Sequence, residues 1–133
     1  MTPEDPVRVV ARRVRELRRR KGWTAAQLGE ALTAQGVPWD RFTVSNLENG
    51  KRQNVTLTEL LALATVLDVA LVHLFVPLND NPVKVTPNRT EDADTVRAWV
   101  RGQEPLPGMD ERIFMTEVAI ADLISARRAS RGE

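Results

Sequence analysis

Helix start signals recur at short intervals through the first 75 residues, and they constrain the fold more than any other feature of the chain. Each signal is a residue whose side chain can cap a helix N-terminus, and two signals also have the spacing of a capping box. The caps are Asp5, Thr24, Asp40 and Thr56. Apolar residues recur at three- and four-residue steps after the caps, which is one face of a helix. We therefore predict four helices, followed by a short fifth helix at about residues 71–75 that ends before Pro77.

The apolar spacing also predicts which side chains form the core of this region. Trp39 precedes the third cap and Val44 lies one turn inside that helix, as in a hydrophobic staple. In the fourth helix we expect the inner stripe to consist of Leu60, Leu61, Ala64 and Leu67. Residues 1–76 are thus predicted to be one helical domain.

The character of the sequence changes after Pro77. The stretch PLNDNPVKVTPNRT contains three prolines and three asparagines, which is typical of a linker or a short extended segment. Beyond it we predict a helix at about residues 91–101 and a last helix at about residues 110–128, separated by GQEPLPG. The expected fold is all-α, with a helical domain over 1–76, a linker or short extended segment over 77–90, and a helical C-terminal region over 91–133.

Charge is distributed unevenly along the chain. Residues 1–75 carry 11 Lys or Arg against 8 Asp or Glu, whereas residues 76–133 carry 8 against 10. Most of the excess lies between Arg8 and Lys21, where Glu16 is the only acidic residue. Such a run has two interpretations, a solvated helix face or a surface for a polyanion. The acidic balance of the second part argues against its lying on a polyanion.

The third predicted helix, in the stretch DRFTVSNLENGKR, carries the side chains that suggest a function. On a helical wheel Val44 and Leu47 face inward, and a polar and aromatic set faces outward. The outward residues are Arg41, Phe42, Ser45 and Asn46. Arginine can donate two hydrogen bonds to guanine, asparagine can bind adenine, and an aromatic edge can contact a thymine methyl. We predict that this face reads DNA bases, although Phe42 could instead cap the domain core.

Short polar and basic side chains surround this face. Thr43 and Asn49 are suited to phosphate oxygens, and Lys51 and Arg52 add positive charge just past the helix end. They are the candidate phosphate contacts on this side of the helix.

Three motifs in residues 8–75 resemble the phage-repressor-like (Xre-type) helix-turn-helix family. They are LRRRKGWTAAQLGEAL, VSNLENGKR and LTELLALATVLDVALVHLF, which follow the family's order and spacing over a little more than half of the chain. The resemblance implies a five-helix DNA-binding domain whose third helix enters the major groove, usually as a dimer on a two-fold operator. It also implies that the residues named above contact DNA, with Ser45 beside the base-reading positions.

The resemblance adds a structural pair and two departures. Arg18 and Glu48 occupy positions that in the family bridge the first and third helices, so we expect a partly buried ion pair. Ala25 stands where the family often has a glutamine that contacts phosphate and base, and we expect Thr24 to serve there instead. The segment TAQGVPW lengthens the turn before the third helix, which leaves open which of residues 39–42 reach the bases.

Several classes of function are disfavoured by composition. The chain has no cysteine and one histidine, which cannot form a zinc site of the usual kinds. We find no glycine-rich phosphate loop and no catalytic triad pattern, so we expect no enzyme activity, no cofactor and no metal. The chain lacks an apolar run of 18 residues, and its N-terminus is unlike a signal peptide. We therefore expect a cytoplasmic protein without a membrane partner.

The C-terminal region suggests a second subunit. Its last helix carries apolar residues on more than one stripe, which favours burial on two sides. We expect a DNA-binding transcriptional regulator, a repressor, that binds an inverted repeat of double-stranded DNA as a homodimer. The alternative is an antitoxin or antirepressor-like regulator whose C-terminal helices bind a partner protein. The sequence leaves any small-molecule effector unknown.

Overall fold

The helices of the first part begin at the residues whose side chains cap them. The computed structural model describes residues 2–117, 124, 128–129 and 131–132. Asp5 Oδ1 accepts a hydrogen bond from the N–H of Val7, and the Thr24 and Thr56 capping boxes are both complete. The first five helices are α1 (Pro6–Arg20), α2 (Ala25–Ala34), α3 (Arg41–Glu48), α4 (Leu57–Val66) and α5 (Val72–Phe75). The predicted caps are therefore confirmed.

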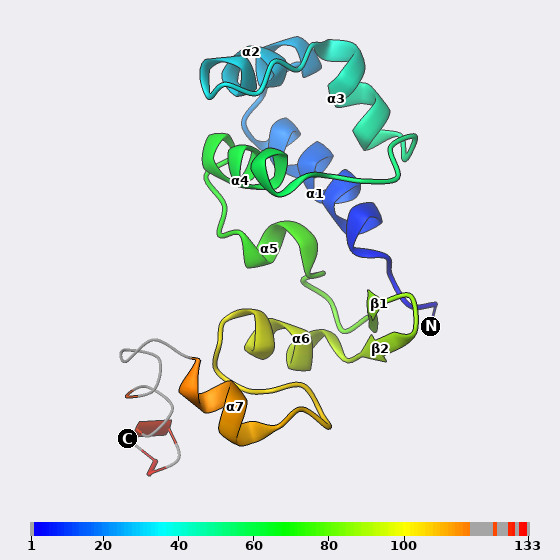
Figure 1. Ribbon diagram of the computed structural model, residues 1–133. Coiled ribbons are helices and arrows are strands. Elements are labelled where there is room, and N and C mark those ends of the chain that lie inside the picture. Colours follow the sequence, from blue (N-terminus) through cyan, green and yellow to red (C-terminus); the bar gives the residue numbers. More distant parts are fainter. Residues whose placement is uncertain (1, 118–123, 125–127, 130, 133) are drawn as a thin grey trace.

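These helices surround one apolar core. Leu17 of α1, Leu28 of α2, Leu47 of α3 and Leu63 of α4 are all buried in the same cluster. Figure 1 shows α2 and α3 together at one end of the molecule, with α1 and α4 beneath them. Helix α5 lies below α4, between these helices and the rest of the chain. Trp39 and Val44 are buried in this core, as the staple pattern predicted.

The predicted inner stripe of α4 was wrong at one position. Leu61 is 47% exposed, and Leu57, one turn earlier, is 68% exposed. The inward face instead follows Leu60, Leu63 and Ala64, and Leu61 is rotated about 100° from Leu60 around the helix. Leu57 and Leu61 thus form an outward apolar pair four residues apart.

The second part of the chain is a smaller lobe built on a hairpin. Strands β1 (Val83–Thr86) and β2 (Arg89–Glu91) pair antiparallel, and Lys84 lies opposite Thr90. The backbone of Glu4 bonds to Pro82 and Lys84, so the N-terminus lies against β1. Residues 77–90 were predicted to be a linker or a short extended segment, and residues 83–86 form one strand of this hairpin.

Helix α6 (Ala93–Val100) covers this hairpin, and α7 (Glu111–Thr116) follows it. Val76, Val83 and Val96 are buried in a second cluster, and Phe75 packs against both clusters. The lobes are also joined by a hydrogen bond from Arg97 of α6 to the carbonyl of Pro77 and by a contact of 3.3 Å between Arg101 Nη2 and His73 Nε2 of α5. Asp110 caps α7 as expected. The last helix was predicted to continue to about residue 128, but most of residues 117–128 lie outside the described residues.

Across the described residues, every helix is too short or too polar to cross a lipid bilayer.

Candidate nucleic-acid interface

A close contact between α2 and the turn before α3 sets the position of α3. Gly29 is buried in α2, and a Cβ atom on it would lie 2.7 Å from the carbonyl oxygen of Trp39. Real Cβ atoms do not come this close to a carbonyl oxygen, so the two backbones can meet here because residue 29 is glycine. The Trp39 indole Nε1 donates to Glu59 of α4 at 3.1 Å, which ties the same turn to a third helix. The longer turn therefore still leads into a firmly placed α3.

Gly29→Ala is expected to destabilise the domain by about 1–3 kcal/mol, because the new methyl group must displace backbone at Trp39 and Asp40. Without that clash, alanine would stabilise a helix interior by roughly 0.5–1 kcal/mol relative to glycine. The sign of the change in the free energy of unfolding, measured by urea denaturation, therefore decides whether the contact matters. A stabilised variant would show that α3 is not fixed in this way.

Arg18 and Glu48 hold the C-terminal end of α3 against α1. Arg18 Nε and Nη2 donate to the two carboxylate oxygens of Glu48 at 2.7 and 2.8 Å, and Nη1 donates to the carbonyl of Trp23 at 2.8 Å. The side chains are 14% and 6% exposed. The hydrogen bond to Glu48 is the main cause that raises the pKa of Arg18. The expected bridge between the first and third helices is present as a bidentate ion pair.

The outward face of α3 is open to solvent. Arg41, Phe42 and Asn46 are exposed and Ser45 is half-buried. Phe42 is 64% exposed, so it does not cap the domain core. Its ring lies 4.9 Å from the Arg41 guanidinium, a distance at which a cation is attracted to an aromatic face. The four side chains predicted to read bases are therefore displayed together.

The N-terminal cap of α3 engages one of the candidate phosphate contacts. Asp40 Oδ1 accepts from the backbone N–H of Thr43 at 2.9 Å and from its hydroxyl at 3.0 Å. These hydrogen bonds lower the pKa of Asp40, those from Thr43 having the largest effect. A threonine hydroxyl has one hydrogen to donate, so Thr43 could donate to a phosphate only by leaving Asp40.

Three other candidate phosphate contacts have a side-chain donor that is not engaged by another described residue. The Thr24 hydroxyl accepts from Gln27 N in the capping box, and its own hydrogen has no acceptor among the described residues. Asn49 caps the C-terminus of α3 and is exposed, and so is Lys51. Their side chains make no hydrogen bond or ion pair within the described part of the chain. These three residues can donate to an anion without breaking a contact.

Arg52 lies in a different environment from the one expected. Its Nη2 bonds to both carboxylate oxygens of Glu59 at 3.2 and 3.1 Å, and its guanidinium lies 4.8 Å from the Trp39 ring. Burial acts to raise the pKa of Glu59, but hydrogen bonds from Thr56 and Arg52 lower it overall. Arg52 is therefore part of the scaffold that joins α3 to α4, and a phosphate would have to compete with Glu59 for it.

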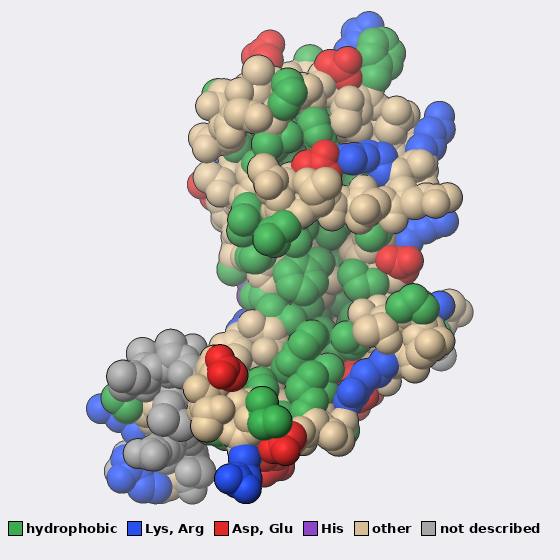
Figure 2. Space-filling view, viewed as in Figure 1, with side chains coloured by type: hydrophobic (Ala, Val, Ile, Leu, Met, Phe, Trp, Pro, Cys, Tyr) green, Lys and Arg blue, Asp and Glu red, His purple; other side chains and the backbone are tan. Residues whose placement is uncertain are grey.

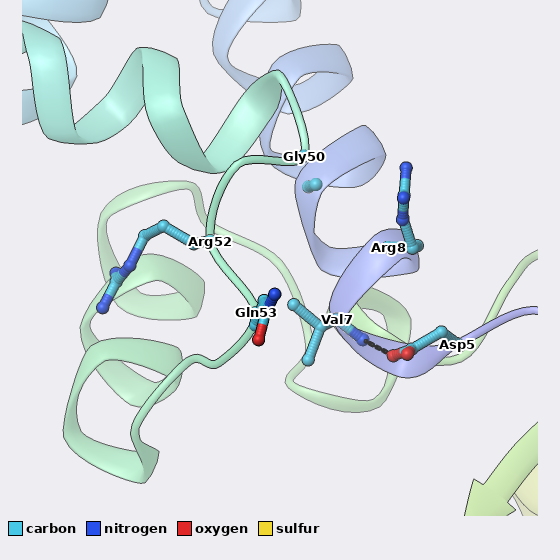
Figure 3. Close-up of a pocket in the computed structure, with 7 residues that line it drawn as sticks. Asp5, Val7, Arg8, Gly50, Arg52 and Gln53 are labelled. Carbon is cyan, nitrogen blue, oxygen red and sulfur yellow. Dashed lines mark hydrogen bonds between the residues drawn. The ribbon is translucent and has the colours of Figure 1, made fainter. Parts of the chain in front are cut away.

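The structure also brings Arg8, which we did not single out from the sequence, to this interface. A hollow of ≈ 400 Å³ separates the first turn of α1 from the turn that follows α3 (Figure 3). A Cβ atom on Gly50 would lie 3.2 Å from Arg8 Nη1. The sequence offered no signal for this, because residues 8 and 50 are brought together only by the packing of α1 on α3.

Comparison with known proteins agrees with this geometry. Residues 9–74 match a family model described as a helix-turn-helix domain. No match was found among curated proteins or solved structures. The matched range runs from within α1 to within α5, so it contains the buried ion pair and the exposed face of α3. The chain therefore carries a helix-turn-helix domain over residues 9–74.

Proposed function

We propose that this chain is a sequence-specific transcriptional regulator of the phage-repressor-like type, which represses transcription by occupying an inverted-repeat operator as a homodimer. One observation carries the proposal. The outward side chains of α3 are exposed while its inner side chains, its N-terminal turn and Glu48 are fixed by the core, by Gly29 and by Arg18. A rigid helix with a free polar face is what base reading in the major groove requires.

The base-reading roles follow from side-chain chemistry. We assign Asn46 and Arg41 to bidentate contacts with base edges, with Phe42 and Ser45 beside them. Arg41 stacks on Phe42 in the free chain, which limits the rotamers of its guanidinium before binding. The affinity that does not depend on sequence is assigned to Thr24, Asn49 and Lys51, with Thr43 and Arg52 able to join only by giving up their present partners.

Asn46→Ala is expected to cost about 1–3 kcal/mol of binding free energy on the preferred operator, and to relax the preference at one base pair. Binding to random duplex should change little, because a base contact contributes mainly to the specific complex. Fluorescence anisotropy with the operator and with a scrambled duplex measures both values. Arg41→Ala should behave in the same way at another base pair.

Lys51→Ala is the matched comparison, because it removes an exposed side chain from the turn just after α3 rather than from its face. It should weaken binding to both duplexes and make the dependence on salt shallower. Equal losses on both duplexes for Asn46→Ala would contradict the assignment of the reading face.

The homodimer is supported by an apolar surface on α4. Leu57 and Leu61 are exposed one turn apart, and Figure 2 shows hydrophobic side chains continuing from α4 across α5 to α6 on that face. In the lobe of α1 to α5, basic side chains lie instead along the edge that carries α3, and others lie on the second lobe. Glu59, the acidic residue of α4, is turned toward Arg52 and Trp39. An uncharged face is suited to a second copy of itself, because a two-fold contact pairs each patch with its own equivalent.

The hydrophobic side chains that continue from α4 across α5 to α6 form an apolar band, and its position also fits the operator symmetry. The band runs along the length of the molecule, and α3 lies at one end of it (Figures 1 and 2). A two-fold axis parallel to the band would therefore place both α3 helices at the same end, where they can meet two successive major grooves of one duplex.

A further inference from the structure

We propose that Arg8 and the turn after α3 form a second binding site for the DNA backbone, occupied by one phosphodiester group outside the reach of the α3 face. The inference rests on the proposed function, because its ligand is the same DNA. It adds the first turn of α1 to a surface otherwise made by α2, α3 and the turn at Lys51. The hollow that carries it is lined by Asp5, Val7, Arg8, Ala11, Gly50, Arg52 and Gln53.

Arg8 belongs to the half of the basic run of α1 that forms no ion pair among the described residues. Arg12 pairs with Glu4 at 2.6 Å, Arg13 with Glu16 at 2.8 Å and Lys21 with Asp68 at 2.7 Å. Arg8 is exposed, and no carboxylate of the described residues pairs with it. Its guanidinium lies against the Gly50 turn, where a side chain on residue 50 would crowd it. Arg15, Arg19 and Arg20 also form no ion pair among the described residues, but of these four arginines only Arg8 lines the hollow and is available to a ligand there.

The turn supplies a further donor to the same hollow. Gln53 lines the hollow, and its side chain, which ends in an amide, is exposed. Guanidinium and amide N–H groups that line one hollow are suited to phosphate oxygens. Asp5 also lines the hollow, but its carboxylate caps α1 through Val7, and the Arg8 side chain extends away from it (Figure 3).

The surroundings of the hollow favour a phosphate of the DNA backbone over free phosphate as its ligand. The hollow adjoins the turn that holds Asn49 and Lys51, which are already assigned to phosphates. A strand that passes the C-terminal end of α3 would therefore continue to Arg8. Arg8 belongs to α1 and Lys51 to the turn after α3. Because the two phosphate contacts come from different elements, together they would fix the tilt of α3 in the groove.

Arg8→Ala tests the proposal, with Arg112→Ala as the matched control. Arg112 is exposed on α7 and makes no hydrogen bond or ion pair within the described residues, so both variants lose one exposed positive charge. Binding of full-length wild type and variants to the selected operator and to a scrambled duplex is measured by anisotropy over a salt series. Thermal unfolding confirms that both variants are folded.

We expect Arg8→Ala to weaken binding to both duplexes several-fold and to make the slope of log K against log salt shallower by about 0.9, the value for one lost phosphate contact. Arg8→Lys should keep most of the slope, and Arg112→Ala should match the wild type. The base preference should be unchanged in all three variants.

An Arg8→Ala variant with wild-type affinity and slope, while the wild type binds its operator, would overturn this inference and leave the proposed function intact. A wild type that prefers no sequence would overturn the proposed function and this inference with it. Inorganic phosphate, added at constant ionic strength, should shift the melting temperatures of wild type and Arg8→Ala equally. A shift confined to the wild type, together with unchanged DNA binding by Arg8→Ala, would show that the hollow takes free phosphate and would overturn the assignment to DNA.

Discussion

Glu48→Ala is expected to lower the free energy of unfolding by about 3–5 kcal/mol, a large part of the stability of a small domain. The substitution leaves the Arg18 guanidinium without its carboxylate at a position where the side chain is only 14% exposed. Its remaining described partner is the carbonyl of Trp23. Urea denaturation followed by circular dichroism measures the loss.

A double variant separates the ion pair from the fold. Arg18→Met combined with Glu48→Leu removes both charges and keeps similar side-chain volumes, so most of the stability should return. If Glu48→Ala alone costs less than about 1 kcal/mol, the range of an exposed ion pair, the bridge does not fix α3 as described.

Leu57→Glu combined with Leu61→Glu is expected to convert a homodimer into a monomer. The two residues are 68% and 47% exposed, so the subunit should still fold, whereas four carboxylates would meet in the dimer. Loss of the second half-site contact should reduce operator affinity by about 10²–10⁴-fold, the usual gain from linking two binding modules. Light scattering after size-exclusion chromatography gives the mass, and anisotropy gives the affinity.

Leu78→Glu is the control, since Leu78 is 57% exposed but lies beside Arg12, Arg13 and Glu16 on α1. It should remain dimeric and bind the operator with wild-type affinity. A wild type that is monomeric on its operator, or a double variant that still dimerises, would contradict the use of the α4 face.

Local signals in the sequence predicted the helical part of the fold well. Thr24 with Gln27 and Thr56 with Glu59 form complete capping boxes, because a cap depends only on residues three positions apart. The inward position of Val44 and the hydrogen-bonded bridge at Arg18 also correspond to what sequence and resemblance indicated.

Features that depend on distant packing could not be predicted in the same way. Leu61 was expected to be buried, and only the angle at which α4 packs decides that Leu63 takes that place. Arg52 was predicted to contact phosphate, but the fold brings Glu59 and Trp39 around it. Gly29 carries no pattern of its own, since its importance arises from a backbone contact ten residues away at Trp39.

The central claim is that α3 reads a DNA sequence, and selection of bound duplexes from a random pool tests it most directly. The wild-type chain should enrich one motif with two-fold symmetry, its half-sites roughly one helical turn apart. Asn46→Ala, selected in parallel, should lose the preference at one base pair in each half-site. A pool without an enriched motif would contradict the claim and favour the alternative in which the chain regulates by binding a partner protein.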